Sequence, residues 1–426
     1  METPPATYTP LENPIVQGIK FIGIGKHGSK PLPEDLLYQI LDYMQSSHAV
    51  PIQLGAFYGA LLAKGPTELE KQLLQALVPG TTAPTIEEIY NSLCTDAPSS
   101  MKKIGVKLLQ KEFLNLKEAR QLGEYLYSDL PGESFRGMAA SMLRIRYETE
   151  EEYQGLIESA EPTYTPGFRE QVPKQKGVLV QLAEPFDGVE HSFMITPLLA
   201  FQLQQLGYKV ISTVGRSSGP KLALNALDLF HQLPASFLQA NTDLQQQAPR
   251  FGWVLDQKIL SPALDQWVDR RRQIFKRPFL ATSEKVLNPT GAHVLITSVF
   301  HITYMEKMVK LANMAGFKGV IILKRGLEGT LAPSLAKASG ILCAARQQDG
   351  TFLTQTFDAA STTLEAYRAE ADENVEPLQV NENIRLINTF TENEATGNLD
   401  FDKRVHLAFA LYQQGLNWVQ EHWQLS

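Results

Sequence analysis

Two apolar runs, Val294-Leu295-Ile296-Thr297-Ser298-Val299 and Gly319-Val320-Ile321-Ile322-Leu323, lie on either side of a stretch with helical spacing, Thr303 to Ala315. Both runs are short and rich in β-branched residues, as is typical of strands that are buried on both faces of a sheet. Two parallel strands joined by a helix form a βαβ unit, so this part of the chain predicts an α/β domain.

The same alternation begins nearer the N-terminus. The run Gly177-Val178-Leu179-Val180-Gln181-Leu182 predicts a strand, Pro197 to Leu206 a helix, and Tyr208 to Val214 a second strand. The interval from Ile259 to Leu287 breaks the alternation with a basic helical stretch, which we expect to lie outside the sheet or against its edge. The last predicted helix, Val405 to Gln420, is amphipathic and closes the domain.

The N-terminal part of the chain predicts helices instead of strands, because apolar residues recur there at helical spacing. Two of its stretches resemble each other: a helix with small residues, Gln53 to Ala60, precedes Thr67-Glu68, and Gly132 to Ala139 precedes Thr149-Glu150. They lie about eighty residues apart, as an internal duplication would place them. The alternative is that two generic amphipathic hairpins match by chance.

The 426 residues exceed one typical domain and predict two or three. The expected boundaries are 1–15 for a flexible tail, 16–160 for a helical domain with related hairpins at about 20–80 and 105–158, 161–176 for a proline-containing linker, and 177–426 for the α/β domain. Residues 259–289 are expected to pack back on the helical domain.

Composition excludes several classes of protein. The hydrophobic fraction of 43% and the charged fraction of 20% are those of a globular chain. The net charge of −7 gives no overall attraction to nucleic acid, so such binding would need a local patch. Cys94 and Cys343 lack metal-ligand spacing and fit a reducing, cytoplasmic location. No apolar run reaches the roughly 18 residues that a membrane helix needs, so we expect no membrane partner.

The order of helical hairpin, linker, α/β domain, helical interruption and return to α/β resembles the anthranilate phosphoribosyltransferase family, grouped with the class II nucleoside phosphorylases. Gly25-Lys26-His27-Gly28 before the first predicted helix and Gln53-Leu54-Gly55-Ala56-Phe57 strengthen the resemblance. The resemblance covers most of the chain. It implies a helical N-terminal domain and a larger α/β domain with a mostly parallel central sheet.

The block from Ser261 to Pro289 carries the rest of the resemblance. Arg271, Arg277 and Asn288 match the family pattern, in which one arginine contacts the aromatic acceptor, whereas Ser261 stands where the family has histidine. The resemblance therefore implies ligand-binding roles for Arg271, Arg277 and Asn288.

The chain departs from the family where the diphosphate of phosphoribosyl diphosphate is bound. In place of a Gly-Thr-Gly-Gly-Asp loop after the first strand it has Ala183-Glu184-Pro185-Phe186-Asp187-Gly188. Proline lacks an amide donor, and Glu184 would place like charge beside a phosphate. Asp187 and Gly188 remain as candidate ligand-binding residues, but a strong diphosphate cradle is not predicted.

Two further motifs are degenerate. The family's Lys-His-Gly-Asn-Arg motif corresponds to Val214-Gly215-Arg216-Ser217-Ser218, which leaves Arg216, Ser217 and Ser218 as candidate phosphate ligands. The paired Asp-Glu that holds magnesium in the family corresponds to a single carboxylate, Glu328, within Arg325-Gly326-Leu327-Glu328. No metal site is expected beyond this one carboxylate, and magnesium would be a cofactor only if the chain is an active transferase.

Retained arginines beside lost catalytic motifs favour a protein that binds a phosphate-bearing ligand, foremost nucleic acid, in the cleft between its domains. Family paralogues with an Arg-Gly-Thr-Glu-Gly-like segment look similar and are associated with nucleic-acid binding. The first alternative is an active phosphoribosyl or pentosyl transferase, although the sequence identifies no catalytic residue. The second is a structural or regulatory partner. A homodimer through the helical domain is expected in any of these cases.

For two of these features a structural role is an alternative to ligand binding or catalysis. The basic stretch from Arg270 to Arg277 either grips phosphate or forms a solvated helix face balanced by Asp265 and Asp269. His27 and His301 are better explained as hydrogen-bonded structural histidines than as catalytic bases.

Overall fold

The computed structural model describes residues 11–23, 28–46, 48–174, 176–218, 224–335, 339–359 and 375–424. By their contacts the residues fall into two units: a helical unit, Met1–Ala160 with Gln266–Leu280, and an α/β unit, Glu161–Asp265 with Ala281–Ser426. The predicted candidates Lys26 and His27 lie outside the described residues.

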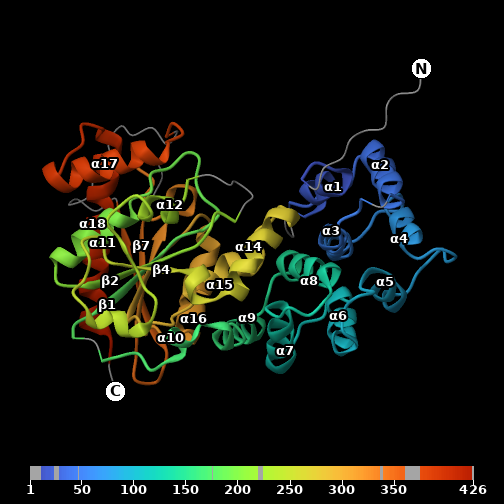
Figure 1. Ribbon diagram of the computed structural model, residues 1–426, viewed down its shortest axis with the longest axis horizontal. Helices are drawn as coiled ribbons and strands as arrows, with labels where there is room; N and C mark the ends of the chain where they lie inside the picture. Colours follow the sequence, from blue (N-terminus) through green and yellow to red (C-terminus); the bar gives the residue numbers. More distant parts are fainter. Residues whose placement is uncertain are drawn as a thin grey trace. The chain divides into compact units, whose positions relative to one another are not determined.

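The helical unit consists of helices and their connecting turns (Figure 1). Its elements are α1 (Pro14–Ile22), α2 (Glu34–Met44), α3 (Pro51–Lys64), α4 (Lys71–Leu77), α5 (Ile86–Leu93), η1 (Ser99–Met101), α6 (Lys102–Leu109), α7 (Leu116–Leu126), α8 (Glu133–Arg146), α9 (Glu150–Glu158) and most of α14 (Pro262–Ile274). Helix α1 begins inside the segment that we predicted as a tail, because the Asn13 side chain accepts a hydrogen bond from Val16 N at 3.0 Å and caps the helix.

The two similar stretches have the same internal hydrogen bonds. Glu70 accepts a hydrogen bond from Leu32 N at 2.9 Å, and Glu152 accepts one from Leu114 N at 2.9 Å. Thr67 and Glu70 exchange the two bonds of a capping box, as do Thr149 and Glu152. Each glutamate also pairs with a cation at the end of the preceding helix. Every one of these residues is separated from its counterpart by 82 positions, as Glu70 is from Glu152.

The helices follow the same spacing. Helix α2 and helix α7 each have 11 residues, and helix α3 and helix α8 each have 14. The Tyr43 hydroxyl donates to His48 O at 2.8 Å, and its counterpart, the Tyr125 hydroxyl, donates to Pro131 O at 2.7 Å. We call α2–α4 the first hairpin module and α7–α9 the second. Shared bonds at a fixed spacing are what an internal duplication leaves behind.

The α/β unit has an eight-stranded sheet. Its strands are β1 (Leu179–Ala183), β2 (Lys209–Val214), β3 (Ser236–Phe237), β4 (Trp253–Asp256), β5 (Val294–Val299), β6 (Gly319–Lys324), β7 (Gly340–Arg346) and β8 (Phe352–Asp358). Its helices are η2 (Glu161–Thr163), α10 (Pro166–Arg169), α11 (Thr196–Gln205), α12 (Ala226–Phe230), η3 (Asn241–Gln245), α13 (Gln257–Leu260), α15 (Leu280–Val286), η4 (Ile302–Tyr304), α16 (Met305–Met314), η5 (Leu327–Gly329), α17 (Val380–Asn393) and α18 (Leu399–His422).

The strand order is β3-β4-β2-β1-β5-β6-β7-β8. Pairs from β3 to β6 are parallel, and β7 and β8 are added antiparallel. The predicted class, an α/β fold with a mostly parallel central sheet, is therefore confirmed. All residues of β1 and β5 are buried, as the apolar runs predicted.

Helices cover both faces of the sheet (Figure 1). Gly415 of α18 lies against Ile321 and Cys343, which share one face of the sheet with Leu182. On the other face the Gln181 side chain donates to the carbonyl groups of Lys285 and Leu287 at the end of α15. The loops that follow the parallel strands are left at the carboxyl edge, where open α/β sheets bind ligands.

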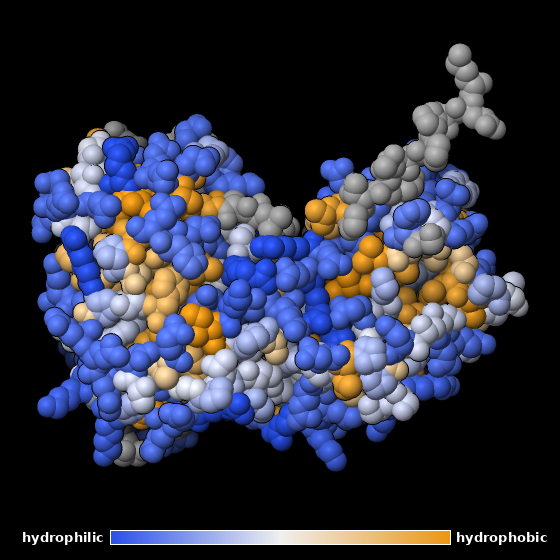
Figure 2. All heavy atoms as spheres, in the orientation of Figure 1, coloured by the Kyte–Doolittle hydropathy of each residue, from blue (hydrophilic) through white to orange (hydrophobic). Residues whose placement is uncertain are grey.

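In the view of Figure 2, hydrophilic side chains cover most of the α/β unit, with smaller apolar areas between them. Among the described helices, none is long and apolar enough to cross a membrane.

Candidate anion-binding site at the carboxyl edge of the sheet

Strand β1 is the point at which the sheet changes direction. The chain leaves β1 towards β2 on one side, and it later enters β5 on the other side and continues to β6. Connections that diverge in this way leave a crevice at the carboxyl ends of the strands. The loops after β1, β5 and β6 therefore form the candidate site.

The loop after β6 closes onto the loop after β1 through two carboxylates. Glu184 accepts hydrogen bonds from the Thr196 hydroxyl and, at 3.2 Å, from Leu331 N of the β6 loop. In return Glu328 of the β6 loop accepts hydrogen bonds from Glu190 N at 3.1 Å and from His191 N at 2.5 Å. We call this reciprocal arrangement the two-loop clasp; each loop supplies a carboxylate to amides of the other.

Further contacts hold the clasp in place. The Ser192 and Thr330 hydroxyl groups lie 3.1 Å apart, and the Ser298 hydroxyl, at the end of β5, donates to Gly329 O. Glu328 has a left-handed backbone with φ of +50°, a conformation that L-residues rarely adopt and that the surrounding contacts must hold. The clasp therefore crosses the end of β5, over the crevice beside β1.

Glu184 is 2% exposed. Burial raises its pKa to about 7, although the hydrogen bonds from Thr196 and Leu331 N favour the ionised form. The clasp thus contains one carboxyl group that titrates near neutral pH.

The predicted candidates Asp187, Gly188 and Ser217 come together beside the clasp. The Ser217 hydroxyl donates to Asp187 O at 3.4 Å, and Gly188 has φ of +83°, a conformation in which glycine is unstrained. Asp187 is buried, as is Ser218.

Phe186 takes up the room above β1 and β2. A Cβ atom at Gly215 would lie 2.6 Å from Phe186 Cδ2, so the ring lies directly against this glycine. Asn225 ties the two loops by donating to Phe186 O at 3.2 Å and to Gly215 O at 2.9 Å. An aromatic ring and Pro185 therefore stand where the family resemblance implied bare amides.

Arg216 is held by Asp265. Its Nε lies 2.9 and 3.1 Å from the two carboxylate oxygens, and its Nη2 donates to Asp265 O at 3.1 Å. The Nε–H is shared between the two carboxylate oxygens, and together with the bond from Nη2 this holds the guanidinium, whose side chain remains 29% exposed.

Asn288 lies at the other edge of the sheet. Its side chain accepts from Ala292 N at 2.7 Å and donates to Ala292 O at 3.0 Å, which shapes the turn before β5. The structure does not bring Asn288 together with Asp187 or Arg216. Arg271, which is buried, and Arg277, which is exposed, belong to the helical unit, whereas the other candidates belong to the α/β unit.

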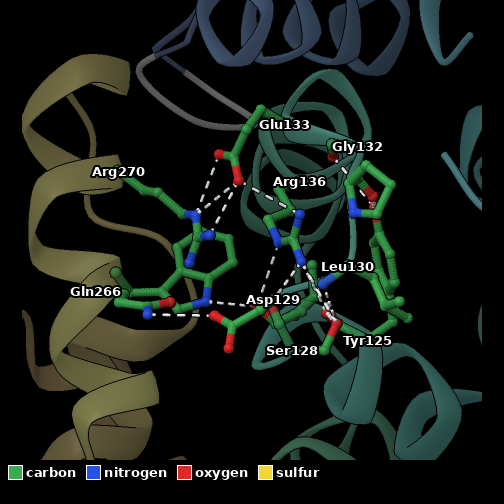
Figure 3. A network of polar contacts seen from close by, with 12 residues as sticks. Tyr125, Ser128, Asp129, Leu130, Gly132, Glu133, Arg136, Gln266 and Arg270 are labelled. Carbon is green, nitrogen blue, oxygen red and sulfur yellow. Dashed lines mark hydrogen bonds and ion pairs between the residues drawn. The ribbon is translucent and has the colours of Figure 1, made fainter. Parts of the chain in front are cut away.

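Most of the basic stretch makes contacts within the helical unit. Arg270 donates to Glu133 at 2.9 to 3.2 Å, and Figure 3 shows the Glu133 carboxylate between Arg270 and the buried Arg136. Arg272 lies 3.6 Å from Asp269, and Lys276 Nζ donates to the Ser141 hydroxyl at 2.8 Å. The bonds of Arg270 and Lys276 join α14 and the segment after it to α8, whereas the Arg272–Asp269 pair lies within α14. Together they leave less of the stretch available for phosphate.

Glu328 is the residue that the resemblance implied as a magnesium ligand. Both of its carboxylate oxygens instead accept backbone amide hydrogens, and no second carboxylate stands beside it in the sequence. Within the described ranges there is no group of three or more His, Cys, Asp or Glu residues that could hold a metal ion. The donor set therefore does not fit magnesium.

Two residues of the site were missed by sequence reasoning. Phe300, directly after β5, is 58% exposed, and its ring meets the exposed His301 edge to face at a centroid distance of 4.8 Å. Arg325 follows β6 and donates its backbone N to Val299 O at 3.2 Å, beside Phe300. Its Nε is buried without a hydrogen-bond partner in the part of the chain that the structure describes. An apolar run that ends in Phe-His was the available clue.

A helical unit with an α/β unit of this topology is the fold of anthranilate phosphoribosyltransferase. The enzyme (TrpD) from Thermus thermophilus superposes with a TM-score of 0.58 at 16% identity, over 74% of this chain and 89% of that one. The enzyme from Saccharomyces cerevisiae, also solved with PRPP and Mg, matches over 91% of both chains at TM-scores of 0.46 and 0.48. The Thermus match shows the fold.

No family model matches the chain. An uncharacterized protein of Aquifex aeolicus is 26% identical over 191 residues, which is 45% of this chain. The match spans 55% of the Aquifex protein, about half its length.

Proposed function

We propose that the carboxyl edge of the sheet binds a phosphate-bearing ligand, and that the ligand is single-stranded nucleic acid. The observation that carries the proposal is the pair of amides of Glu190 and His191, which hold an anionic group, the Glu328 carboxylate. Backbone amides that converge on a carboxylate present the same donors to a phosphate oxygen. In this proposal a phosphate group takes the place of Glu328.

The surroundings of the amides favour a nucleotide over a bare phosphate. Phe300 and His301 offer exposed rings, and bases stack on such rings without regard to sequence. Arg325, whose backbone N donates to Val299 O next to Phe300, brings a positive charge to the end of β6. The segment 325–330 resembles the Arg-Gly-Thr-Glu-Gly-like segment of the family paralogues that are associated with nucleic-acid binding, which supports the same ligand class.

Phosphoribosyl transfer is less well supported. The reaction depends on holding a diphosphate and its metal. Here Pro185 has no amide hydrogen, the Phe186 ring lies against Gly215, and Glu328 is engaged by Glu190 N and His191 N. The transferase alternative predicts diphosphate release from phosphoribosyl diphosphate with magnesium and anthranilate, and we expect none.

The test is binding of labelled single-stranded DNA and RNA to the full chain across a salt series. We expect affinity that falls with salt, because phosphate contacts release counterions. Phe300→Ala should weaken binding by about tenfold, the value of one lost stacking contact of roughly 1–3 kcal/mol. Leu353→Ala, which also truncates an exposed apolar side chain but on strand β8, should leave affinity unchanged.

Glu328→Gln provides the second arm. Removing the charge weakens the hold of residue 328 on the amides, so phosphate competes better and affinity should rise about threefold to tenfold. Absence of binding at low salt, or an affinity that ignores salt, would disprove the proposal. Unchanged affinity in both Phe300→Ala and Glu328→Gln would place any binding elsewhere on the chain.

A further inference from the structure

The two hairpin modules contact each other through helices α3 and α8, and equivalent residues of the two helices make the same contact in both directions. A Cβ atom at Gly55 would lie 1.8 Å from Ser134 O and 2.9 Å from Met138 N. A Cβ atom at Gly137 would lie 2.0 Å from Ile52 O and 2.8 Å from Ala56 N. The backbones touch at these two glycines, which leave no room for a side chain.

The partners in this contact are themselves equivalent. Gly55 and Gly137 are separated by 82 positions, the spacing that relates Glu70 to Glu152, and Ile52 and Ser134 are separated by the same 82. The contact of Gly55 with Ser134 is therefore repeated as the contact of Gly137 with Ile52. Contacts in which each side presents the same patch to the other define an isologous, two-fold interface.

Both helices are buried almost all round. Residues 52–62 of α3 are buried except Leu54, and residues 134–143 of α8 are all buried. A helix without an exposed face has no surface to offer to another chain. The two helices cover one another at the glycines, and α1 and α6 cover further parts of α3 and α8.

We infer that the helical unit is a two-fold dimer of hairpin modules made within one chain, and that the α3–α8 contact takes the place of pairing between two copies through this face. The partner of the first hairpin module is the second one. In this inference an internal pair takes the place of the expected homodimer through this face, so two copies of the full chain do not pair through α3 and α8.

Matched substitutions on the two sides test the symmetry. Gly55→Ala and Gly137→Ala each drive a methyl group into a carbonyl oxygen of the opposite helix, so we expect them to lower the melting temperature by similar amounts. Because both act on one contact, the double variant should lose clearly less than the sum of the two. Gly55 and Gly137 lie inside helices and do not have a positive φ, so the loss measures the steric contact and not backbone strain.

A milder pair keeps the test open if the glycine variants do not fold. Glu70→Gln and Glu152→Gln each remove the charge that holds one module's cation and amides, and the two should lower the melting temperature alike. A large loss in one variant of either pair with none in the other would overturn the inference.

The oligomeric state is measured on the full chain by sedimentation velocity over a wide range of concentrations. A monomer throughout supports the inference. A dimer that Gly55→Ala or Gly137→Ala dissociates while the subunits stay folded would overturn it, because the face would then serve two chains.

Discussion

The carboxyl group of Glu184 illustrates how one buried residue sets a response of the whole α/β unit. It lies at the end of a central strand, and its neighbours offer it two hydrogen bonds but no counter-charge among its described contacts. Between the ordinary pKa of 4.5 and about 7, the folded chain keeps a proton at this position that the unfolded chain has lost. The free energy of unfolding therefore falls as the pH rises through this window.

Glu184→Gln should remove this dependence. Glutamine keeps the shape and one acceptor but cannot ionise. The free energy of unfolding of the variant minus that of the wild type should therefore be on the order of 3 kcal/mol larger above pH 7 than below pH 4.5. Urea unfolding on both sides of the window measures the difference. Parallel pH profiles for the two proteins would show that Glu184 does not hold its proton.

At the scale of elements, helix α7 ends on a buried cation. Arg136 donates to Tyr125 O at 3.2 Å, to Leu126 O at 3.4 Å and to Ser128 O at 2.7 Å (Figure 3). Carbonyl groups at the end of a helix lack intrahelical donors and carry partial negative charge, so the guanidinium satisfies them in two ways. Glu133 joins this arginine to Arg270 of α14.

Arg136→Met and Glu133→Gln should therefore differ in cost. Removing the arginine leaves buried carbonyl groups without donors, and we expect a loss of about 3 kcal/mol. Glu133 is partly exposed, and the loss of its pairing should cost about 0.5–1 kcal/mol. Thermal unfolding compares them, and equal losses would contradict this account of the helix end.

The strands predicted from the sequence were those that are buried and therefore appear as short apolar runs. Buried runs gave β5 at its observed bounds and β1, β2 and β6 within one or two residues. Strand β8 has exposed polar side chains along most of its length and shows no such run, and β3 has two residues. Helix α1 was missed because its cap, Asn13, lies in a segment that reads as a tail.

The site was harder to predict than the sheet. Asp187, Gly188 and Ser217 were predicted from the motifs of the family resemblance, and the structure brings them together. That they bind a ligand stays a prediction. The clasp joins Glu328 to Glu190, 138 positions apart, and no periodicity encodes such a pair. Local sequence shows that a carboxylate follows a strand, but the amide that it meets is decided by how the loops fold.

At the scale of the molecule, the two units each contain one buried ionisable group of opposite kind. Burial lowers the pKa of Lys276 to about 7, with the nearby Arg144 charge adding to the effect. Between about 7 and the ordinary value of 10.5, the folded chain binds one proton fewer than the unfolded chain at this position, so the helical unit gains stability as the pH rises.

Calorimetry of the full chain should therefore show opposite pH dependences of the melting temperature for the two units. We expect the melting temperature of the α/β unit to fall between pH 4.5 and about 7, and that of the helical unit to rise between about 7 and 9. Above pH 9 the raised pKa of the buried Cys94 thiol opposes this rise. Lys276→Met should abolish the second trend and spare the first. A loss of both trends in that variant would mean that the units do not respond separately.

The joining of the two hairpin modules also has a kinetic consequence. Covalent attachment through residues 78–115 sets the effective concentration of each module around the other, whatever the amount of protein in the cell. Assembly of this pair is then a first-order event that dilution cannot slow. Each half can also acquire its own outward-facing residues, since a change in one is no longer copied into the other, as it would be in a pair of identical chains.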